Sequence, residues 1–196
     1  MEIEVKFYLR HLEDIRKRLI ALGGRQKTDR LLEHNIRFDT PDRELAGEKD
    51  VLRLRQDSRT TMTFKHHLGQ VETREEFEIE IDDFEIGRKI LDALGYTVTT
   101  VYEKYRETYQ LDAVQVMLDE LPFGHFVEIE GPSIESIRQM SNRLGLSWER
   151  RVRVSYNGIF ERIRRSLNLA FEEVTFEKFE GLAPIDLELL DVLKAD

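Results

Sequence analysis

Apolar and polar residues alternate strictly along several short segments of the chain. In residues 2–9, Ile3, Val5, Phe7 and Leu9 fall on one face, and Glu2, Glu4, Lys6 and Tyr8 fall on the other. A period of two is the signature of a strand. The same period recurs at residues 35–39, 51–55, 61–65 and 74–81, and further strands are expected near 102–110, 113–119, 125–130 and 150–156. The pattern predicts a protein built on an antiparallel sheet.

Helical spacing of apolar residues separates these strands at three places, residues 11–22, 83–94 and 133–144. Each predicted helix ends at a glycine, as expected of a C-terminal cap. The first two helices share a short sequence repeat, Arg16–Gly23 and Arg88–Gly95. The repeat suggests two similar halves that complete one barrel; chance similarity between two amphipathic helices is the alternative.

The end of the chain has a different pattern. We expect an amphipathic helix at about 157–168, less regular chain after it, and a short helix near 185–193. The sequence therefore predicts a domain over residues 1–157 and a helical C-terminal appendage over residues 158–196.

The polar positions of the predicted strands carry many charges of both signs. The cations are Lys6, Arg37, Arg53, Arg55, Lys65, Arg74, Lys104, Arg106, Arg151 and Arg153, and the anions are Glu2, Glu4, Glu76, Glu78, Glu80, Asp119, Glu128 and Glu130. The polar face of a single antiparallel strand usually meets water. Here three amphipathic helices are available to cover the apolar face, so the charged face would curl inward. The sequence predicts an α+β fold: an eight-stranded antiparallel β-barrel, or tunnel, with a charged interior and helices packed on the outside.

Charges inside such a tunnel are costly unless they are paired or matched by a ligand. Phosphates match arginine and lysine, and hard cations such as Mg²⁺ or Mn²⁺ match carboxylates. The expected ligand is therefore a small polyanion that binds together with a divalent metal.

Composition limits the other classes of function. The net charge of −9 argues against a surface that binds nucleic acid as a whole, although it leaves room for a local cationic pocket. The absence of cysteine excludes disulfides and thiolate chemistry. The N-terminus does not resemble a signal peptide, and no apolar run approaches the ~20 residues that span a bilayer. We expect a cytoplasmic protein without nucleic-acid or membrane partners, and whether it forms a homodimer stays open.

The charged strands resemble those of the CYTH family, also called triphosphate tunnel metalloenzymes, which contains class IV adenylate cyclases, thiamine triphosphatases and inorganic triphosphatases. The matching motifs are Glu2-Ile3-Glu4-Val5-Lys6, Leu52-Arg53-Leu54-Arg55, Thr63-Phe64-Lys65, Arg74-Glu75-Glu76-Phe77-Glu78, Lys104-Tyr105-Arg106, Asp119 with Glu128-Ile129-Glu130, and Ser155-Tyr156. The resemblance covers about residues 1–157 in the family order. One departure is Val154, where many members carry lysine.

This resemblance implies a division of roles among the charged residues. The metal ligands for one or two Mg²⁺ or Mn²⁺ ions would be Glu2, Glu4, Asp119, Glu128 and Glu130. The phosphate-binding residues would be Lys6, Arg53, Arg55, Lys65, Arg74, Lys104, Arg106, Arg151 and Arg153. Glu76 and Glu78 would either join the metal site or brace the arginines.

The substrate implied by the resemblance is a small-molecule triphosphate: tripolyphosphate, ATP or thiamine triphosphate. In a hydrolase water attacks a phosphorus of the triphosphate, whereas in a cyclase the ribose 3′-oxygen of ATP attacks the α-phosphorus. The sequence does not decide between them, and we place hydrolysis slightly ahead because we find no adenine-pocket signal. A catalytically silent sensor of polyphosphate or nucleotide is the non-enzyme alternative, but it could dispense with the carboxylates that this chain keeps.

Overall fold

The computed structural model describes residues 3–67 and 74–196, without the side chain of Arg74. The described residues form one nine-stranded sheet in the order β5-β4-β3-β2-β6-β7-β8-β1-β9. Neighbouring strands are antiparallel throughout. The strands are β1 Ile3–Leu9, β2 Arg25–Asp39, β3 Val51–Gln56, β4 Thr60–His67, β5 Arg74–Ile81, β6 Thr97–Leu111, β7 Val114–Leu121, β8 Gly124–Gly131 and β9 Arg151–Val152.

Helices lie between the strands and after the sheet. They are α1 Leu12–Ala21, α2 Glu44–Glu48, α3 Phe84–Ala93, α4 Ile134–Arg143, α5 Tyr156–Leu167 and α6 Phe176–Phe179, with 3₁₀ turns at Trp148–Arg150 and Leu187–Leu190. The three helices predicted within the domain and the first predicted helix of the appendage are thus confirmed. No helix among the residues that the structure describes is long and apolar enough to cross a membrane.

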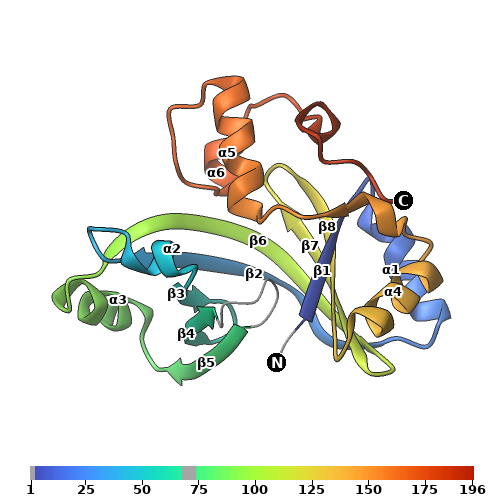
Figure 1. Cartoon of the computed structure of the whole chain (residues 1–196), viewed down its shortest axis with the longest axis horizontal. Coiled ribbons are helices and arrows are strands. Elements are labelled where there is room, and N and C mark those ends of the chain that lie inside the picture. The colour runs from blue at the N-terminus through green and yellow to red at the C-terminus, as the bar shows by residue number, and fades with distance from the viewer. Residues whose placement is uncertain (1–2, 68–73) are drawn as a thin grey trace.

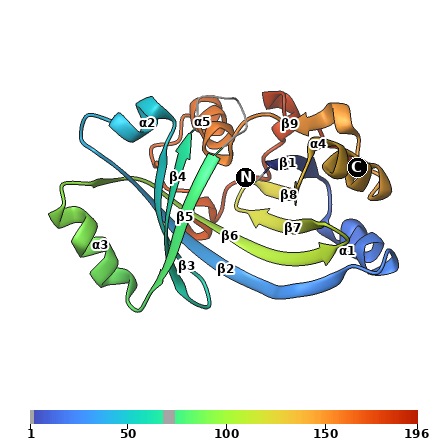
Figure 2. The same cartoon turned by 60° about the horizontal axis from the view of Figure 1, so that its bottom comes forward.

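Two long strands join the two halves of the sheet. β2 and β6 have 15 residues each and pair along their length. β3, β4 and β5 extend the sheet from one side of this pair, and β7, β8 and β1 extend it from the other (Figures 1 and 2). Each long strand follows a charged strand and a helix, β1–α1–β2 in one case and β5–α3–β6 in the other. The expected similarity of two halves is therefore present in the order of elements.

The apolar face of the sheet is covered by helices on both halves. On one half, Phe7, Leu118 and Val127 pack with the buried residues Ile15 and Ile137 of α1 and α4. On the other half, α3 packs its buried residues Phe84 and Leu91 into a cluster with Ile36, Phe38, Leu52 and Leu54. We call this the outer face. The predicted placement of these helices on the apolar side is confirmed, as is the α+β class.

The sheet differs from the prediction in its strand count and in its closure. Nine strands are present, and within the described ranges β5 and β9 form two ends that do not pair with each other. The strand predicted at 150–156 shrinks to the two residues of β9, because Ser155 caps a helix instead: its side chain accepts a hydrogen bond from the backbone N–H of Gly158. The result is an open, curved sheet that is consistent with a tunnel fold.

The C-terminal segment packs on the sheet face opposite to that of α1, α3 and α4. Ile159, Phe160 and Ile163 of α5 form one apolar cluster with Tyr8 and Phe126. Further along, Val174 pairs with the edge of β6, where its carbonyl accepts from Glu103 N–H and its own N–H donates to the Val101 carbonyl, both at 2.8 Å. The boundary at residue 157 stays a prediction, and the segment after it shares a core with the sheet.

Candidate functional site

The second face of the sheet, which we call the inner face, gathers most of the charged residues expected in the tunnel. Antiparallel cross-strand partners point to the same side of a sheet, so the register identifies this face strand by strand. One row runs from Arg37 through Arg53 and Thr63 to Glu78, and another pairs Lys6 with Glu128. The inner face carries Glu4, Lys6, Glu33, Asn35, Arg37, Arg53, Arg55, Thr63, Lys65, Glu76, Glu78, Tyr102, Lys104, Arg106, Asp119, Glu128 and Glu130.

Asp119 on β7 holds two cations of β6. Its carboxylate is fully buried and accepts two hydrogen bonds from Arg106, Nε to Oδ1 and Nη2 to Oδ2, both at 2.6 Å. Lys104 Nζ donates to Oδ2 at 3.1 Å. A carboxylate that accepts several charge-assisted hydrogen bonds fixes the positions of the cations that donate them. This engagement leaves Asp119 less free to bind a metal than the resemblance implied.

Glu128 is the second buried carboxylate of this cluster. Its Oε1 lies 3.1 Å from Lys6 Nζ, and its Oε2 accepts a hydrogen bond from Arg106. Burial alone would raise the pKa of Glu128, but Lys6, Arg106 and Lys104 outweigh it and hold this pKa well below its usual range. Glu128 is therefore ionised and neutralises cations of the inner face.

Glu33 on β2 links the two halves of the charged face. Its carboxylate is buried and lies 3.7 Å from Lys104, 3.8 Å from Arg55 and 3.9 Å from Arg106. Burial acts to raise the pKa of Glu33, yet these cations lower it to about 2. Sequence reasoning missed Glu33 because residues 25–34 were not predicted to be a strand. Its two-residue spacing from Asn35 and Arg37 was the signal that could have found it.

The arginines of β2 and β3 have more donors than acceptors. Arg53 Nη2 donates to Thr63 Oγ1 at 3.2 Å and lies 3.8 Å from Glu78, and Arg55 Nη2 lies 3.6 Å from Glu78. The Nε groups of Arg37, Arg53 and Arg55 are buried, and none has a hydrogen-bond acceptor within the described ranges. A buried donor without an acceptor is costly. An anion on the inner face would supply the missing acceptors.

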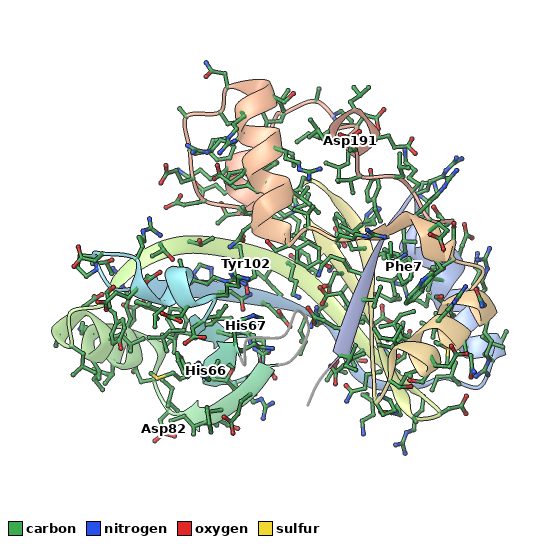
Figure 3. All side chains as sticks on the ribbon, viewed as in Figure 1. Phe7, His66, His67, Asp82, Tyr102 and Asp191 are labelled. Carbon is green, nitrogen blue, oxygen red and sulfur yellow. The ribbon has the colours of Figure 1, made fainter. Side chains whose placement is uncertain are left out.

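Tyr102 on β6 lies among these cations, near the middle of the molecule (Figure 3). The guanidinium of Arg37 is 5.8 Å from the centre of its ring. Burial acts to raise the pKa of the Tyr102 phenol, but Arg53, Arg37 and Lys104 outweigh it and lower the pKa. The lowered pKa reports the excess of positive charge at this part of the inner face. Nothing in the sequence pattern singled out Tyr102, since aromatic residues are common at strand positions.

A pair of carboxylates lies on β1 and β8, at the edge of the charged network. Glu4 and Glu130 are direct cross-strand partners. The Glu4 side chain is 48 % exposed, and its nearest cation is Lys6 at 3.8 Å. No group of three His, Cys, Asp or Glu side chains in the described ranges forms a preformed metal centre. Two oxygen-bearing side chains still fit Mg²⁺ or Mn²⁺, because such ions take few protein carboxylates and complete their shell with phosphate oxygens and water.

The structure brings together most of the site residues predicted from the sequence. Arg151 does not join them, because it pairs with Phe7 and therefore lies on the outer face. There its Nη1 donates to the Trp148 carbonyl at 3.0 Å. Arg153 lies beyond the end of β9 and is exposed. Glu2 and the side chain of Arg74 lie outside the described residues.

Glu76 and Glu78, expected either to join the metal site or to brace the arginines, lie on β5 at the other end of the inner face. Glu78 Oε2 accepts a hydrogen bond from Thr63 Oγ1 at 2.8 Å, and Glu76 Oε2 lies 2.8 Å from Lys65 Nζ. Both carboxylates therefore contact groups of β4. This geometry favours the bracing role of Glu76 and Glu78 over direct metal binding.

Comparison with known proteins finds relatives that are similar to this chain in sequence and in fold. A curated protein of Methanocaldococcus jannaschii, whose name proposes an adenylate cyclase, is 26% identical over 169 residues, which are 80% of this chain and 96% of that protein. A solved structure from Vibrio parahaemolyticus, also described as a proposed adenylate cyclase, has a TM-score of 0.74 at 21% identity and covers 82% of this chain and 97% of its own.

A third relative matches almost the whole chain. It is a Hippeastrum protein described as a proposed adenylyl cyclase with a dominant triphosphatase activity, and it has a TM-score of 0.52 at 20% identity, covering 98% of this chain and 97% of its own. At these identities the two solved structures show a shared fold. The family model of the CYTH domain matches residues 1–142. Because that match spans most of the chain, this protein belongs to the CYTH domain family.

Proposed function

We propose that this chain is a divalent-metal-dependent hydrolase of a small-molecule triphosphate. The observation that carries the proposal is the surplus of buried guanidinium donors on Arg37, Arg53 and Arg55, on the same sheet face as the carboxylate pair of Glu4 and Glu130. Buried cations with unused donors match a polyanion. Carboxylates at the edge of the same face match the hard cation that accompanies triphosphates.

Cleavage of a phosphoanhydride depends mostly on positioning and on neutralising negative charge. Arg37, Arg53 and Arg55 would bind phosphate oxygens from one half of the sheet, and Lys104 and Arg106 would bind them from the other. Glu33 and Asp119 hold these cations in place before the substrate arrives, through the contacts described above. Preorganised charge of this kind stabilises a transition state without reorganisation during the reaction.

Glu4 and Glu130 would hold the metal. A bound Mg²⁺ or Mn²⁺ would supply charge neutralisation at the phosphate oxygens. The exposed fraction of Glu4 leaves its carboxylate accessible to a cation from solvent, whereas Glu128 is already paired with Lys6. Glu4 and Glu130 are thus the carboxylates least engaged in internal ion pairs, which is why we choose them as the metal ligands.

A class IV-type adenylate cyclase is the second candidate. It is favoured by the names of the Methanocaldococcus jannaschii and Vibrio parahaemolyticus proteins. The Hippeastrum protein, by its description, has a dominant triphosphatase activity despite being proposed as a cyclase. Since the two chemistries share the phosphate grip, we keep hydrolysis as the first candidate.

Product analysis tests the proposal. Purified protein is supplied with tripolyphosphate, ATP or thiamine triphosphate, each with Mg²⁺ or Mn²⁺, and the products are separated. Release of orthophosphate supports the hydrolase. Formation of cyclic AMP and pyrophosphate from ATP would contradict the hydrolase proposal and support the cyclase. Tight binding of a triphosphate with no product from any of the three would contradict an enzyme and favour a sensor.

A further inference from the structure

Tyr156 connects the C-terminal helix to the charged cluster of the inner face. It is the first residue of α5, and its hydroxyl donates a hydrogen bond to Asp119 Oδ2 at 3.0 Å. The Tyr156 ring lies 4.9 Å from Lys6 Nζ and 5.6 Å from Lys104 Nζ, measured to the ring centre. The ring also packs against Phe126, at 5.0 Å between ring centres. One side chain from outside the matched residues 1–142 thus contacts three charged residues of the site.

The hydroxyl of Tyr156 completes the set of donors around Asp119. The carboxylate already accepts two bonds from Arg106 and one from Lys104. An ionised carboxylate offers about four lone-pair positions. The hydrogen bond from Tyr156 fixes the position of Oδ2 on the side that faces α5. It thereby also fixes the orientation of the carboxylate that binds Lys104 and Arg106.

The ring of Tyr156 acts on the lysines in a second way. An ammonium within about 6 Å of an aromatic centre is attracted to the face of the ring. Lys6 and Lys104 both lie within that range. Burial, followed by the charges of Asp119 and Glu128, raises the pKa of the Tyr156 phenol well above its usual value. The phenol acts as a hydrogen-bond donor through its contact with Asp119 Oδ2.

We propose that Tyr156 is a positioning residue for the triphosphate grip, acting through Asp119 on Lys104 and Arg106 and through its ring on Lys6. This inference rests on the proposed function of the inner face and adds α5 to the parts of the chain that set substrate affinity. It predicts that the hydroxyl matters for binding of triphosphate more than for the stability of the fold.

The test uses Tyr156→Phe, which removes the hydroxyl and keeps the ring against Phe126 and the lysines. Tripolyphosphate binding is measured by titration calorimetry in the presence of Mg²⁺. We expect Kd to weaken by about three- to tenfold, the range for loss of one hydrogen bond of ordinary net strength. If the protein turns substrate over, KM should rise by a similar factor while kcat changes by less than about twofold.

Tyr105→Phe is the matched control, because the Tyr105 ring lies between Arg30 and Phe176, away from Asp119. Its Kd should equal that of the wild type. A second variant, Lys104→Gln, tests whether Tyr156 acts through Asp119. Tyr156→Phe should weaken binding less in the Lys104→Gln background than in the wild type, because both residues contact the same carboxylate.

Two results would overturn the inference. One is a Kd of Tyr156→Phe within twofold of the wild type, and the other is full additivity with Lys104→Gln. If the wild type itself binds no tripolyphosphate, the proposed function fails and the inference fails with it.

Discussion

Arg37 and Arg53 are direct cross-strand partners on β2 and β3, and the buried Nε of each has no hydrogen-bond acceptor within the described ranges. Like charges directly opposite each other destabilise a sheet. Glu78, the carboxylate nearest to Arg53, lies 3.8 Å away and also serves Arg55. The pair is understandable if an anion occupies the inner face when the protein works.

Replacing one member of this pair should separate stability from binding. In Arg37→Met we expect the free protein to be as stable as the wild type or more stable, by up to about 1 kcal/mol, because a like-charge contact is lost. Tripolyphosphate affinity should fall by about tenfold or more, since a charge-assisted contact to phosphate is removed. Urea denaturation without ligand and calorimetric titration measure the two effects. Arg59→Met is the control, because Arg59 is exposed and lies beside Glu80, and it should change neither quantity.

The Glu33 carboxylate should make stability depend on pH. Its pKa falls from 4.5 to about 2 on folding, so its contribution, roughly 3 kcal/mol, is present above about pH 4.5 and is lost as the pH falls toward 2. Glu33→Gln lacks this contribution. The variant should therefore be less stable than the wild type at pH 7, and the gap should narrow by pH 3. A gap in unfolding free energy that stays constant over this range would show that Glu33 is not held ionised by Lys104, Arg106 and Arg55.

Turnover should require a divalent metal. With EDTA we expect phosphate release to stop, and with added Mg²⁺ or Mn²⁺ we expect it to return, because Glu4 and Glu130 are oxygen ligands of the kind these ions prefer. The measurement is orthophosphate release from tripolyphosphate. Undiminished turnover in excess chelator would refute the metal requirement.

Glu4→Gln should remove turnover and leave triphosphate binding largely intact. The change takes away a ligand charge while keeping the shape of the side chain, and the cations of the inner face remain. Steady-state rates and titration calorimetry measure the two quantities. Glu149→Gln is a control of the same chemistry at an exposed position, where the carboxylate lies 3.9 Å from the Arg151 guanidinium. Wild-type kcat in Glu4→Gln would show that the first strand does not hold the metal.

The parts of the fold that the sequence predicted well are those where one face is uniformly apolar. β1 alternates without a break, and its Phe7 and Leu9 are buried on the outer face as expected. Residues 25–34 of β2 were missed, and in this stretch the pairing with β6 shifts register between Gln26 and Thr28 and again between Thr28 and Leu31. Such bulges interrupt the period of two in the first part of the strand, whereas Glu33 follows them and keeps a two-residue spacing with Asn35 and Arg37.

The predicted site residues that lie away from the inner face show a second limit of prediction from the sequence. Arg151 and Arg153 alternate with valines, as the other charged positions alternate with apolar residues. Which face they take depends on how β9 pairs with β1, and the register sets Arg151 opposite Phe7. Alternation within one strand defines two faces, but only pairing between strands decides which of them is the inner face.

The most direct test of the charged inner face as a triphosphate site is the rise in melting temperature that tripolyphosphate causes. A ligand that binds the folded state alone raises Tm, and at a given ligand concentration the rise grows with the logarithm of its affinity. Wild-type protein, Arg53→Ala, Arg55→Ala and Arg151→Ala are heated with and without tripolyphosphate and Mg²⁺. We predict a large rise in the wild type, an equal rise in Arg151→Ala, whose side chain lies on the outer face, and a clearly smaller rise in Arg53→Ala and Arg55→Ala. Equal rises in all four proteins would contradict the account, because they would show that the inner-face arginines do not contact the phosphates.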